Sequence, residues 1–222
     1  MRVLAIGAHP DDIELGCGAS LAAHRAAGHD VALLVMTTGE QGPQAARSRV
    51  EEQDEAAQLL GARMYWGGFD DGEVPDGRAP IAAIEQVMAD FGATIVYTHS
   101  PRDTHQDHRA TGEATLAAAR RCSRVLMYES PSSTGFRPTL FVDVADHVET
   151  KLSLIRAHIS QVLKNGLVDL EAIEALARHR GFTARVRYAE AFETDRFVLA
   201  IGEAAAPAAE LDLTLEEIGA RR

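Results

Sequence analysis

The chain has 222 residues, of which 46% are apolar and 25% are charged, a balance typical of a soluble globular domain and not of disordered, collagen-like or membrane-embedded chains. Its 22 Lys and Arg residues against 33 Asp and Glu residues give a formal net charge of −11, and without a basic stripe to meet phosphates we expect no nucleic-acid partner. No window approaches the run of about 20 apolar residues that a membrane span requires.

Short apolar runs rich in β-branched residues alternate with longer helical patterns, which is typical of βαβ units. In chain order, the expected elements are strand Val3–Gly7, helix Glu14–Ala27, strand Val31–Thr37, helix Arg47–Leu60, strand Arg63–Trp66, helix Ile81–Phe91, strand Thr94–Thr98, helix Ala110–Arg121, strand Arg124–Tyr128, strand Leu140–Val144 and helix His147–Ile159. Gly28, Gly61 and Gly92 follow three of these helices, where a left-handed cap suits glycine. The pattern predicts an α/β fold: a Rossmann-like open, mostly parallel sheet with helices on both faces.

The pattern becomes less regular after the last of these helices. We expect a helix over Val168–His179 and then an extended pair, Ala184–Phe192 and Arg196–Ile201, that forms a hairpin at the sheet edge. This β/α extension completes a single domain over residues 1–203. The remaining segment, 204–222, is expected to be a tail or a peripheral helix.

The two cysteines indicate the compartment. Cys17 and Cys122 are too few for a disulfide framework and lack the spacing of a zinc finger, which favours a reducing environment. The first residues, Met1–Ile6, lack the long apolar region and the small-residue cleavage site of a secretory signal. Both features predict a cytoplasmic protein.

An acidic cluster with one histidine follows the first predicted strand. His9, Asp11 and Asp12 lie in the sequence His-Pro-Asp-Asp, and Glu14 comes two positions later. Ligands of open parallel sheets bind outside the carboxyl ends of the strands, so we expect function in this loop. The loop lacks the Gly-x-Gly-x-x-Gly pattern of a dinucleotide site, and its carboxylates would repel a pyrophosphate, which argues against NAD binding.

A second cluster follows the fourth predicted strand. It reads Asp103-Thr104-His105-Gln106-Asp107-His108. In the common doubly wound order the first and fourth strands are neighbours at the point where the strand order reverses, so the two clusters would face each other. Two histidines and one carboxylate leave coordination positions open for water and substrate, as in zinc hydrolases. His9, Asp12 and His108 could supply such a set.

The residues alone leave the individual ligands open, since the two aspartates of the first cluster are adjacent and the two histidines of the second lie three positions apart. The residue types still suggest a division of labour for amide hydrolysis, which needs a base for the water, a donor for the oxyanion and a proton for the leaving amine. Asp11 is a candidate base. His105, oriented by Asp107 or Asp103, is a candidate cationic donor.

With these two motifs, Gly-Ala-His-Pro-Asp-Asp-Ile-Glu at 7–14 and Asp-Thr-His-Gln-Asp-His at 103–108, the chain resembles the PIG-L/LmbE family of zinc-dependent N-deacetylases. The resemblance implies action on N-acetylglucosaminyl groups, as in lipid anchors, thiol precursors and antibiotic intermediates. It covers most of the chain, because further matching residues fall in the family's order: Thr38-Gly39-Glu40, Arg49, Glu52, Leu60-Gly61, Phe69–Gly72, Lys151, His158–Gln161 and Tyr188–Phe192. Gln106 stands where members often have proline, a departure we expect to be harmless.

The resemblance also implies roles for individual residues. Match by match, it implies that the metal ligands are His9, Asp12 and His108. It implies that Asp11 is the general base. It also implies that His105, supported by Asp107, stabilises the tetrahedral intermediate. The implied cofactor is Zn²⁺, although two imidazoles and a carboxylate also accept Fe²⁺ or Mn²⁺. The expected partner is a small N-acetylated amino sugar or glycoconjugate, and family habit suggests a homo-oligomer.

Three further residues are candidate substrate contacts. Arg49 has a guanidinium suited to sugar hydroxyls or carboxylates, but it could instead form a surface ion pair with Glu52. Asp71 could bind the sugar or serve only as a turn residue. Arg102 could contact substrate or merely neutralise the acidic rim.

Other classes share parts of the pattern. Phospho-acceptor receiver domains also place paired aspartates after the first strand, but they need a lysine at the end of the fifth strand, where this chain has Tyr128-Glu129. A haloacid-type phosphatase needs Asp-x-Asp, and neither class accounts for the histidines. Within the same fold, a hydrolase of another acyl group and a metal-dependent sugar-binding protein without turnover stay open.

Overall fold

A seven-stranded sheet runs through the part of the chain that the computed structural model describes, which is residues 1–42, 48–164 and 168–199. The strands lie in the order β3-β2-β1-β4-β5-β7-β6. Their bounds are β1 Arg2–Gly7, β2 Asp30–Thr37, β3 Arg63–Phe69, β4 Ile95–His99, β5 Arg124–Tyr128, β6 Leu140–Asp143 and β7 Ala189–Phe197. Strands β1 to β5 are parallel, and β7 runs antiparallel to β5 and β6. The predicted open, mostly parallel sheet is confirmed.

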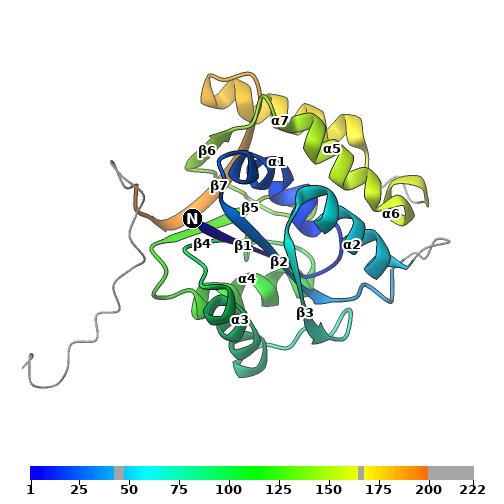
Figure 1. Ribbon diagram of the computed structural model, residues 1–222, viewed down its shortest axis with the longest axis vertical. Helices are drawn as coiled ribbons and strands as arrows, with labels where there is room; N and C mark the ends of the chain where they lie inside the picture. Colours follow the sequence, from blue (N-terminus) through cyan, green and yellow to red (C-terminus); the bar gives the residue numbers. More distant parts are fainter. Residues whose placement is uncertain (43–47, 165–167, 200–222) are drawn as a thin grey trace, which may run out of the picture.

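Helices cover both faces of the sheet, as expected (Figure 1). On one face lie α1 Asp12–Ala26, α2 Arg49–Leu60, α5 Val148–Ala157, α6 Ile159–Lys164 and α7 Leu170–Ala184. On the other face lie α3 Arg78–Phe91 and α4 Gln106–Ala118. Each layer buries its own apolar cluster against the sheet, which is the arrangement that a parallel sheet with continuous apolar strands requires.

Local capping explains where several helices begin and end. Helix α2 begins at Arg49, slightly later than predicted, because the Ser48 side chain accepts the Glu51 N–H while the Glu51 carboxylate accepts the Ser48 N–H. The three glycines predicted to end helices all adopt left-handed backbone, with φ of 74°, 69° and 68° at Gly28, Gly61 and Gly92. Glycine reaches this region without the penalty that a Cβ imposes.

The C-terminal part differs from the prediction. Helix α7 extends to Ala184, and β7 is one continuous strand inserted between β5 and β6, so the expected edge hairpin is wrong. The polar residues 193–195, which would form the turn of the hairpin, belong to β7. The Glu193 carboxylate is hydrogen-bonded there, because it accepts the Ser100 hydroxyl at 2.9 Å and the Arg137 N–H at 2.7 Å. The predicted tail, 204–222, lies outside the described residues, and the single domain over 1–203 stays a prediction.

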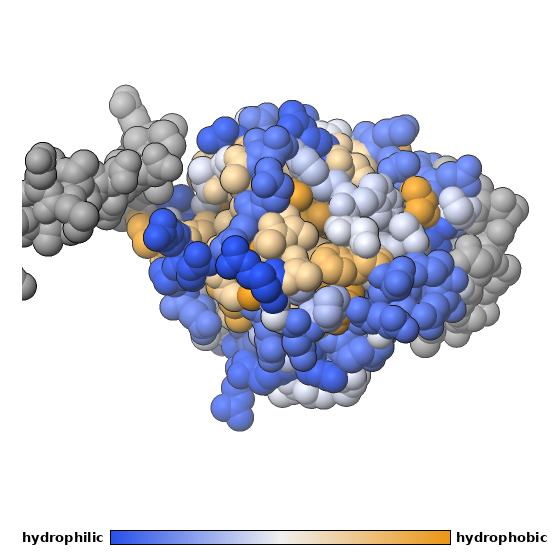
Figure 2. Space-filling view, turned by 90° about the horizontal axis from the view of Figure 1, so that it is seen from below, coloured by the Kyte–Doolittle hydropathy of each residue, from blue (hydrophilic) through white to orange (hydrophobic). Residues whose placement is uncertain are grey.

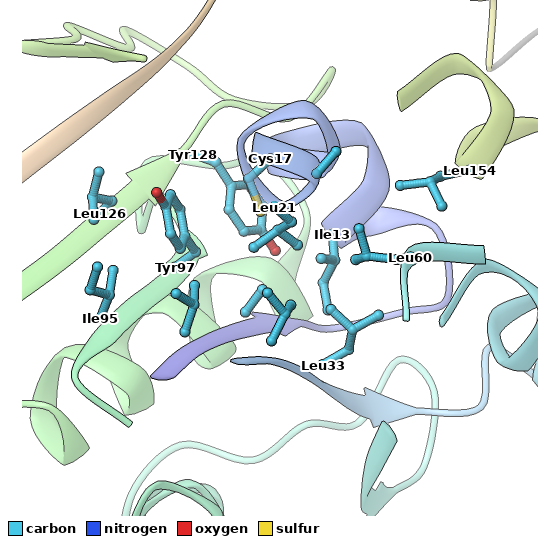
Figure 3. Packing of buried hydrophobic residues seen from close by; sticks show 14 of the residues in the cluster. Ile13, Cys17, Leu21, Leu33, Leu60, Ile95, Tyr97, Leu126, Tyr128 and Leu154 are labelled. Carbon is cyan, nitrogen blue, oxygen red and sulfur yellow. The ribbon is translucent and has the colours of Figure 1, made fainter. Parts of the chain in front are cut away.

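The core beneath α1 is built around two tyrosines. Cys17 and Leu21 pack toward Tyr97 and Tyr128 (Figure 3), and the Tyr128 hydroxyl donates to a β1 carbonyl at 2.8 Å. A Cβ on Gly16 would lie 2.2 Å from the Tyr128 ring. Glycine at this position therefore lets α1 approach the sheet closely enough to cover the ring.

Helix α1 breaks one residue later, at Cys17, where φ is −143° and ψ is 17°. A buried ion pair satisfies the backbone groups that the break exposes. Lys151 Nζ donates to the Leu15 carbonyl at 2.7 Å and lies 2.6 Å from Glu190 Oε1. The Glu190 carboxylate accepts the N–H groups two and three residues after the break, at 3.1 and 2.7 Å. The ion pair thus acts as an internal helix cap.

Glu190→Gln should lower the free energy of unfolding by about 3 kcal/mol, because it leaves the buried Lys151 ammonium without a charged partner. Urea denaturation of the purified protein measures this loss. Glu149→Gln, on the exposed side of α5, is the matched control and should change stability by less than about 0.5 kcal/mol. Equal stability of the two variants would contradict the capping role.

His24 makes the stability depend on pH. It lies near the end of α1, where its ring nitrogens contact the Tyr97 hydroxyl at 3.0 Å and His29 at 2.8 Å. Burial, reinforced by His29, lowers the pKa of His24 from 6.5 to about 4. Between these values the unfolded chain binds more protons than the folded one, so stability falls as pH drops through this window. At about pH 5 the contribution of His24 should lower the free energy of unfolding by about 2 kcal/mol relative to neutral pH. Urea unfolding at the two pH values should show this loss in the control variant His179→Gln and not in His24→Gln.

The surface on the α3 and α4 side mixes hydrophilic and hydrophobic residues, and the hydrophobic ones gather toward the middle of the view (Figure 2). Among the described helices, none has both the length and the apolar character needed to cross a lipid bilayer. The homo-oligomer stays a prediction.

Candidate active site

Two loops that leave neighbouring strands bring the two predicted clusters together. Strand β1 pairs directly with β4, so the loop before α1 and the loop before α4 leave the same edge of the sheet. The strand order reverses between these two strands. The predicted proximity of the two clusters at the switch point is therefore confirmed.

The Asp12 carboxylate lies between His9 and His108. Its Oδ2 is 3.2 Å from His9 Nδ1, and its Oδ1 is 3.3 Å from His108 Nε2. Oδ2 also accepts the His9 N–H at 2.7 Å, which holds the carboxylate at the start of α1. All three side chains are buried. The structure brings together the three residues that the sequence analysis named as ligands.

Each of the two imidazoles meets a further carboxylate at its outer nitrogen. His9 Nε2 lies 3.1 Å from Asp107 Oδ2 and 3.1 Å from Asp71 Oδ1. His108 Nδ1 lies 3.2 Å from Asp103 Oδ2. Outer carboxylates of this kind fix the tautomer of metal-binding histidines and leave the inner nitrogen available as a ligand.

The cluster concentrates buried negative charge. Burial opposes a charged imidazole, yet the carboxylates, led by Asp107, raise the pKa of His9 to about 12. Burial likewise opposes the charge on His108, but Asp12 and Asp103 raise its pKa to about 9. Although burial raises the pKa of Asp12, the histidines, led by His108, hold it well below its usual range. The carboxylates therefore favour a positive charge between them, whether a proton or a metal ion.

His99, the last residue of β4, belongs to this cluster, and the sequence analysis missed it. Its Nε2 lies 3.2 Å from Asp12 Oδ2 and accepts the Ala8 N–H at 3.1 Å. Its ring stacks on His108 with the ring centroids 4.0 Å apart. Burial lowers the pKa of His99 to about 4, so the ring is neutral. Because the Ala8 N–H engages the Nε2 lone pair, His99 is a weaker ligand candidate than His108.

His105 caps the start of α4 and its ring lies against both other histidines. The ring centroids are 4.7 Å from His9 and 4.6 Å from His108. Its Nδ1 accepts the Asp107 N–H at 3.3 Å, which leaves the ring proton on Nε2. Burial, with the neighbouring histidines, lowers the pKa of His105. This tautomer leaves Nε2–H as the donor of the ring, and the cationic state expected from the sequence stays a prediction.

The Asp107 carboxylate also differs from the expectation that it supports His105. It bonds His9 Nε2, and it accepts the N–H groups of Gly72 at 2.7 Å and Val74 at 3.1 Å. Its contact with His105 runs through the backbone N–H instead. Residues two apart at the start of a helix do not face each other, so this carboxylate turns to His9 and to the loop after β3.

Asp11 lies beside Arg49, with Oδ1 3.5 Å from Arg49 Nη2. Burial, opposed by Arg49, raises the pKa of Asp11 to about 6. Arg49 is itself buried and donates to the Pro10 carbonyl at 2.5 Å. Glu52, buried as well, accepts the N–H and hydroxyl of Ser160 at 2.9 and 2.6 Å. A surface ion pair between Arg49 and Glu52 is therefore excluded.

The two remaining candidates lie in different surroundings. Asp71 is buried in the cluster, where Oδ1 faces His9 and Oδ2 accepts the Gln41 N–H at 2.9 Å. Arg102 has an exposed side chain that pairs with Glu193. It lines a cavity of about 300 Å³ together with Pro101, Leu116, Met127, Arg137, Thr139, Glu193, Thr194 and Asp195. The structure joins Asp71, and not Arg102, to the histidine cluster.

The described residues offer overlapping sets of metal donors. Three triads have donor atoms that all lie within 4.8 Å of one another: His9, His105 and His108; Asp12, His99 and His108; and His9, Asp71 and Asp107. His9 and His108 each occur in two of them, and Asp12 contacts both. The centre of the cluster is therefore around these three side chains.

Comparison with known proteins identifies the family. The family model PIG-L, described as GlcNAc-PI de-N-acetylase, matches residues 4–119, which is just over half of the chain and includes both clusters. The chain belongs to the PIG-L family.

Two relatives and one solved structure are similar to most of the chain. A protein of Escherichia coli (strain K12) named uncharacterized deacetylase YaiS is 39% identical over 167 residues, which cover 71% of this chain and 90% of that protein. The diacetylchitobiose deacetylase of Thermococcus kodakarensis is 29% identical over 216 residues, which cover 85% and 81%. The structure of N,N'-diacetylchitobiose deacetylase from Pyrococcus horikoshii with its inhibitor superposes with a TM-score of 0.76 at 26% identity, over 86% of this chain and 82% of that one.

Proposed function

We propose that this PIG-L protein is a zinc-dependent hydrolase that removes the N-acetyl group from an N-acetylglucosaminyl-type amino sugar or its conjugate. The observation that carries the proposal is the pair of adjacent buried aspartates at the start of α1. Asp12 is shared between His9 and His108, while Asp11 faces Arg49 and stays outside that set. The matching family and the deacetylase names of the relatives support the reaction class.

The donor set fits a small divalent cation. Zinc holds nitrogen and oxygen ligands at about 2.0–2.2 Å, which separates neighbouring donors of a tetrahedral site by about 3.4 Å. Asp12 Oδ2 lies 3.2 Å from His9 Nδ1, and Asp12 Oδ1 lies 3.3 Å from His108 Nε2. His9, Asp12 and His108 together are not one of the three triads described above, so both Asp12 oxygens are needed to reach the two imidazoles. These three residues would hold the metal, and the same donors accept Fe²⁺ or Mn²⁺. When bound, the metal would polarise the acetamide carbonyl and make a water molecule more acidic.

Asp11 is the proposed general base. A carboxyl with a pKa of about 6 is ionised at neutral pH, yet it is basic enough to accept a proton from the attacking water. Once protonated, the same carboxyl can give that proton to the leaving nitrogen as the C–N bond breaks. Water thus supplies its hydroxyl to the acetyl carbon and its proton to the amine, and the products are acetate and the free amino sugar.

His105 is the proposed donor to the carbonyl oxygen as negative charge develops on it. The Asp107 N–H holds the ring in the tautomer that keeps the proton on Nε2, and a neutral imidazole N–H can stabilise an oxyanion. The Asp107 carboxylate supports the reaction through His9, whose outer nitrogen it fixes. In this proposal one residue therefore positions both His105 and His9.

Arg49 and Asp71 are the proposed contacts to the sugar, because both are buried against the cluster. Within the described residues, Arg49 Nε is a buried donor without a hydrogen-bond partner, and an acceptor group that reached it would satisfy this N–H. The cavity that Arg102 lines includes no residue of the histidine cluster, so its contact with substrate stays a prediction. The cytoplasmic location and the homo-oligomer also stay predictions.

Acetate release from a panel of N-acetylglucosaminyl compounds tests the proposed function. The zinc-loaded protein should release acetate from at least one member, in equal amount to the free amine formed. If the protein released a different acid from analogues with another acyl group, and no acetate, that acyl group would be the one removed and the proposed deacetylation would be wrong. Failure to release any acid, with zinc bound in equal amount to protein, would favour a sugar-binding role without turnover.

A further inference from the structure

The backbone at Asp11 adopts a conformation that L-residues rarely take. Its φ is 96° and its ψ is −26°, a left-handed conformation that costs a residue with a Cβ about 1–2 kcal/mol. Asp11 precedes the first residue of α1, but its side chain makes no capping hydrogen bond to the helix. The left-handed turn thus directs the carboxylate away from the helix amides, which usually bind an aspartate in this position.

Gln53 of α2 binds the backbone of this turn. Its side chain is fully buried, and its Oε1 accepts the Asp11 N–H at 3.3 Å. Its Nε2 donates to Glu14 Oε1 at 2.8 Å, and the other Glu14 oxygen lies 3.4 Å from His158 Nε2. Because the Asp11 N–H can only donate, it takes the amide oxygen of Gln53 and leaves the amide nitrogen facing Glu14. Gln53 is oriented so that its oxygen meets the strained peptide.

A second side chain on the same face of α2 binds the residue before Asp11, which is Pro10. Arg49 lies one helical turn before Gln53, so the two side chains are neighbours on α2. Arg49 Nη2 donates to the Pro10 carbonyl at 2.5 Å. That carbonyl and the Asp11 N–H belong to the same peptide group, which α2 therefore binds at both of its polar atoms. A peptide held in this way cannot rotate without losing two buried hydrogen bonds.

We propose that Gln53 is a positioning residue of the active site, which acts through the Pro10–Asp11 peptide and keeps the Asp11 carboxylate aimed at the substrate. This inference rests on the proposed function, because Asp11 is the proposed base. Gln53 itself supplies no base, acid or metal ligand for the hydrolysis. Its contribution should therefore appear in the turnover step and not in metal binding.

Hydrogen exchange at the Asp11 amide tests the physical part of this inference without any substrate. Gln53→Met keeps the volume of the side chain and removes its hydrogen bonds. Exchange of the Asp11 N–H in the zinc-loaded protein should become at least about 10-fold faster. Gln58→Met, on the exposed side of the same helix, is the control and should leave the exchange rate unchanged. Unchanged exchange in Gln53→Met would overturn the inference.

Steady-state kinetics test the functional part. In Gln53→Met, kcat should fall about 10- to 100-fold, the range typical of residues that orient a catalytic group, while KM and the zinc dissociation constant should stay within about 3-fold. A merely structural role would lower the melting temperature and leave kcat unchanged below it. Faster exchange with wild-type kcat would therefore also overturn the inference.

Two further arms separate failure of this inference from failure of the proposed function. If Gln53→Met does not fold, Gln53→Asn, which keeps an amide but shortens its reach, should show the same changes in exchange and kcat. If the wild-type protein releases no acid from any compound, the exchange measurement still decides whether Gln53 holds the peptide. If no compound is hydrolysed, the proposed function is wrong, and so is the part of the inference that makes Gln53 a positioning residue for a catalytic base.

Discussion

Asp11→Asn should lower kcat for deacetylation by about 10³-fold, within the range found when a general base is removed. Zinc affinity should stay within about 3-fold of wild type, because Asp11 lies outside the proposed ligand set. Asparagine is the suitable replacement because it tolerates left-handed backbone better than most residues, so the turn at Asp11 should persist. Acetate release at saturating substrate, together with the zinc content of the purified variant, measures both quantities.

The control for this variant is Asp76→Asn, which makes the same chemical change at an exposed position before α3. It should keep wild-type kcat. Wild-type turnover by Asp11→Asn would place the base elsewhere in the cluster. Loss of both zinc and turnover would instead make Asp11 a ligand, and the division of roles between the two aspartates would be wrong.

His108→Ala should weaken zinc binding by more than about 100-fold, since loss of an outer partner of a ligand already costs about 10–100-fold. The variant removes one of the two imidazoles that face Asp12, and it leaves the Asp103 carboxylate without its ring partner. Competition with a chromophoric chelator measures the zinc dissociation constant directly. Activity should disappear when zinc is limiting.

His179→Ala is the matched control, because His179 is an exposed histidine on α7. Its zinc dissociation constant should equal that of the wild type. If His108→Ala bound zinc as tightly as this control, another triad of the cluster would have to hold the metal. The triad with His9, Asp71 and Asp107 lacks His108 and would then be the candidate.

The sequence predicts the sheet and the two loops because their signals are local. The periodicity of apolar residues, the glycines that end helices and the polar motifs that follow strands all depend on neighbouring residues only. The pairing of β1 with β4 follows from the common doubly wound strand order. His99 gives no such signal, since a single histidine at the end of an apolar strand resembles a core residue. Its role depends on Asp12 and Ala8, which are distant in sequence.

The parts that sequence reasoning missed depend on side-chain direction. The partner of Asp107 depends on how the His105 cap leads into α4, and a spacing of two residues does not reveal which way each side chain turns. Glu193 falls between the two strands of the expected hairpin, and its neighbours in sequence do not reveal that its partners are Ser100 and Arg137. Buried polar residues with remote partners were the main source of error.

The ion pair at the break in α1 links the order of synthesis to the order of assembly. The N–H groups that Glu190 caps lie 170 and 171 residues before it in the chain. A ribosome releases the helix that begins with Asp12 long before it releases β7, so this helix can be completed only at a late stage. Contacts at such long separation slow folding. A chain that ends ahead of β7 would therefore lose more than one strand of the sheet, because the helix at the active site would lack its cap.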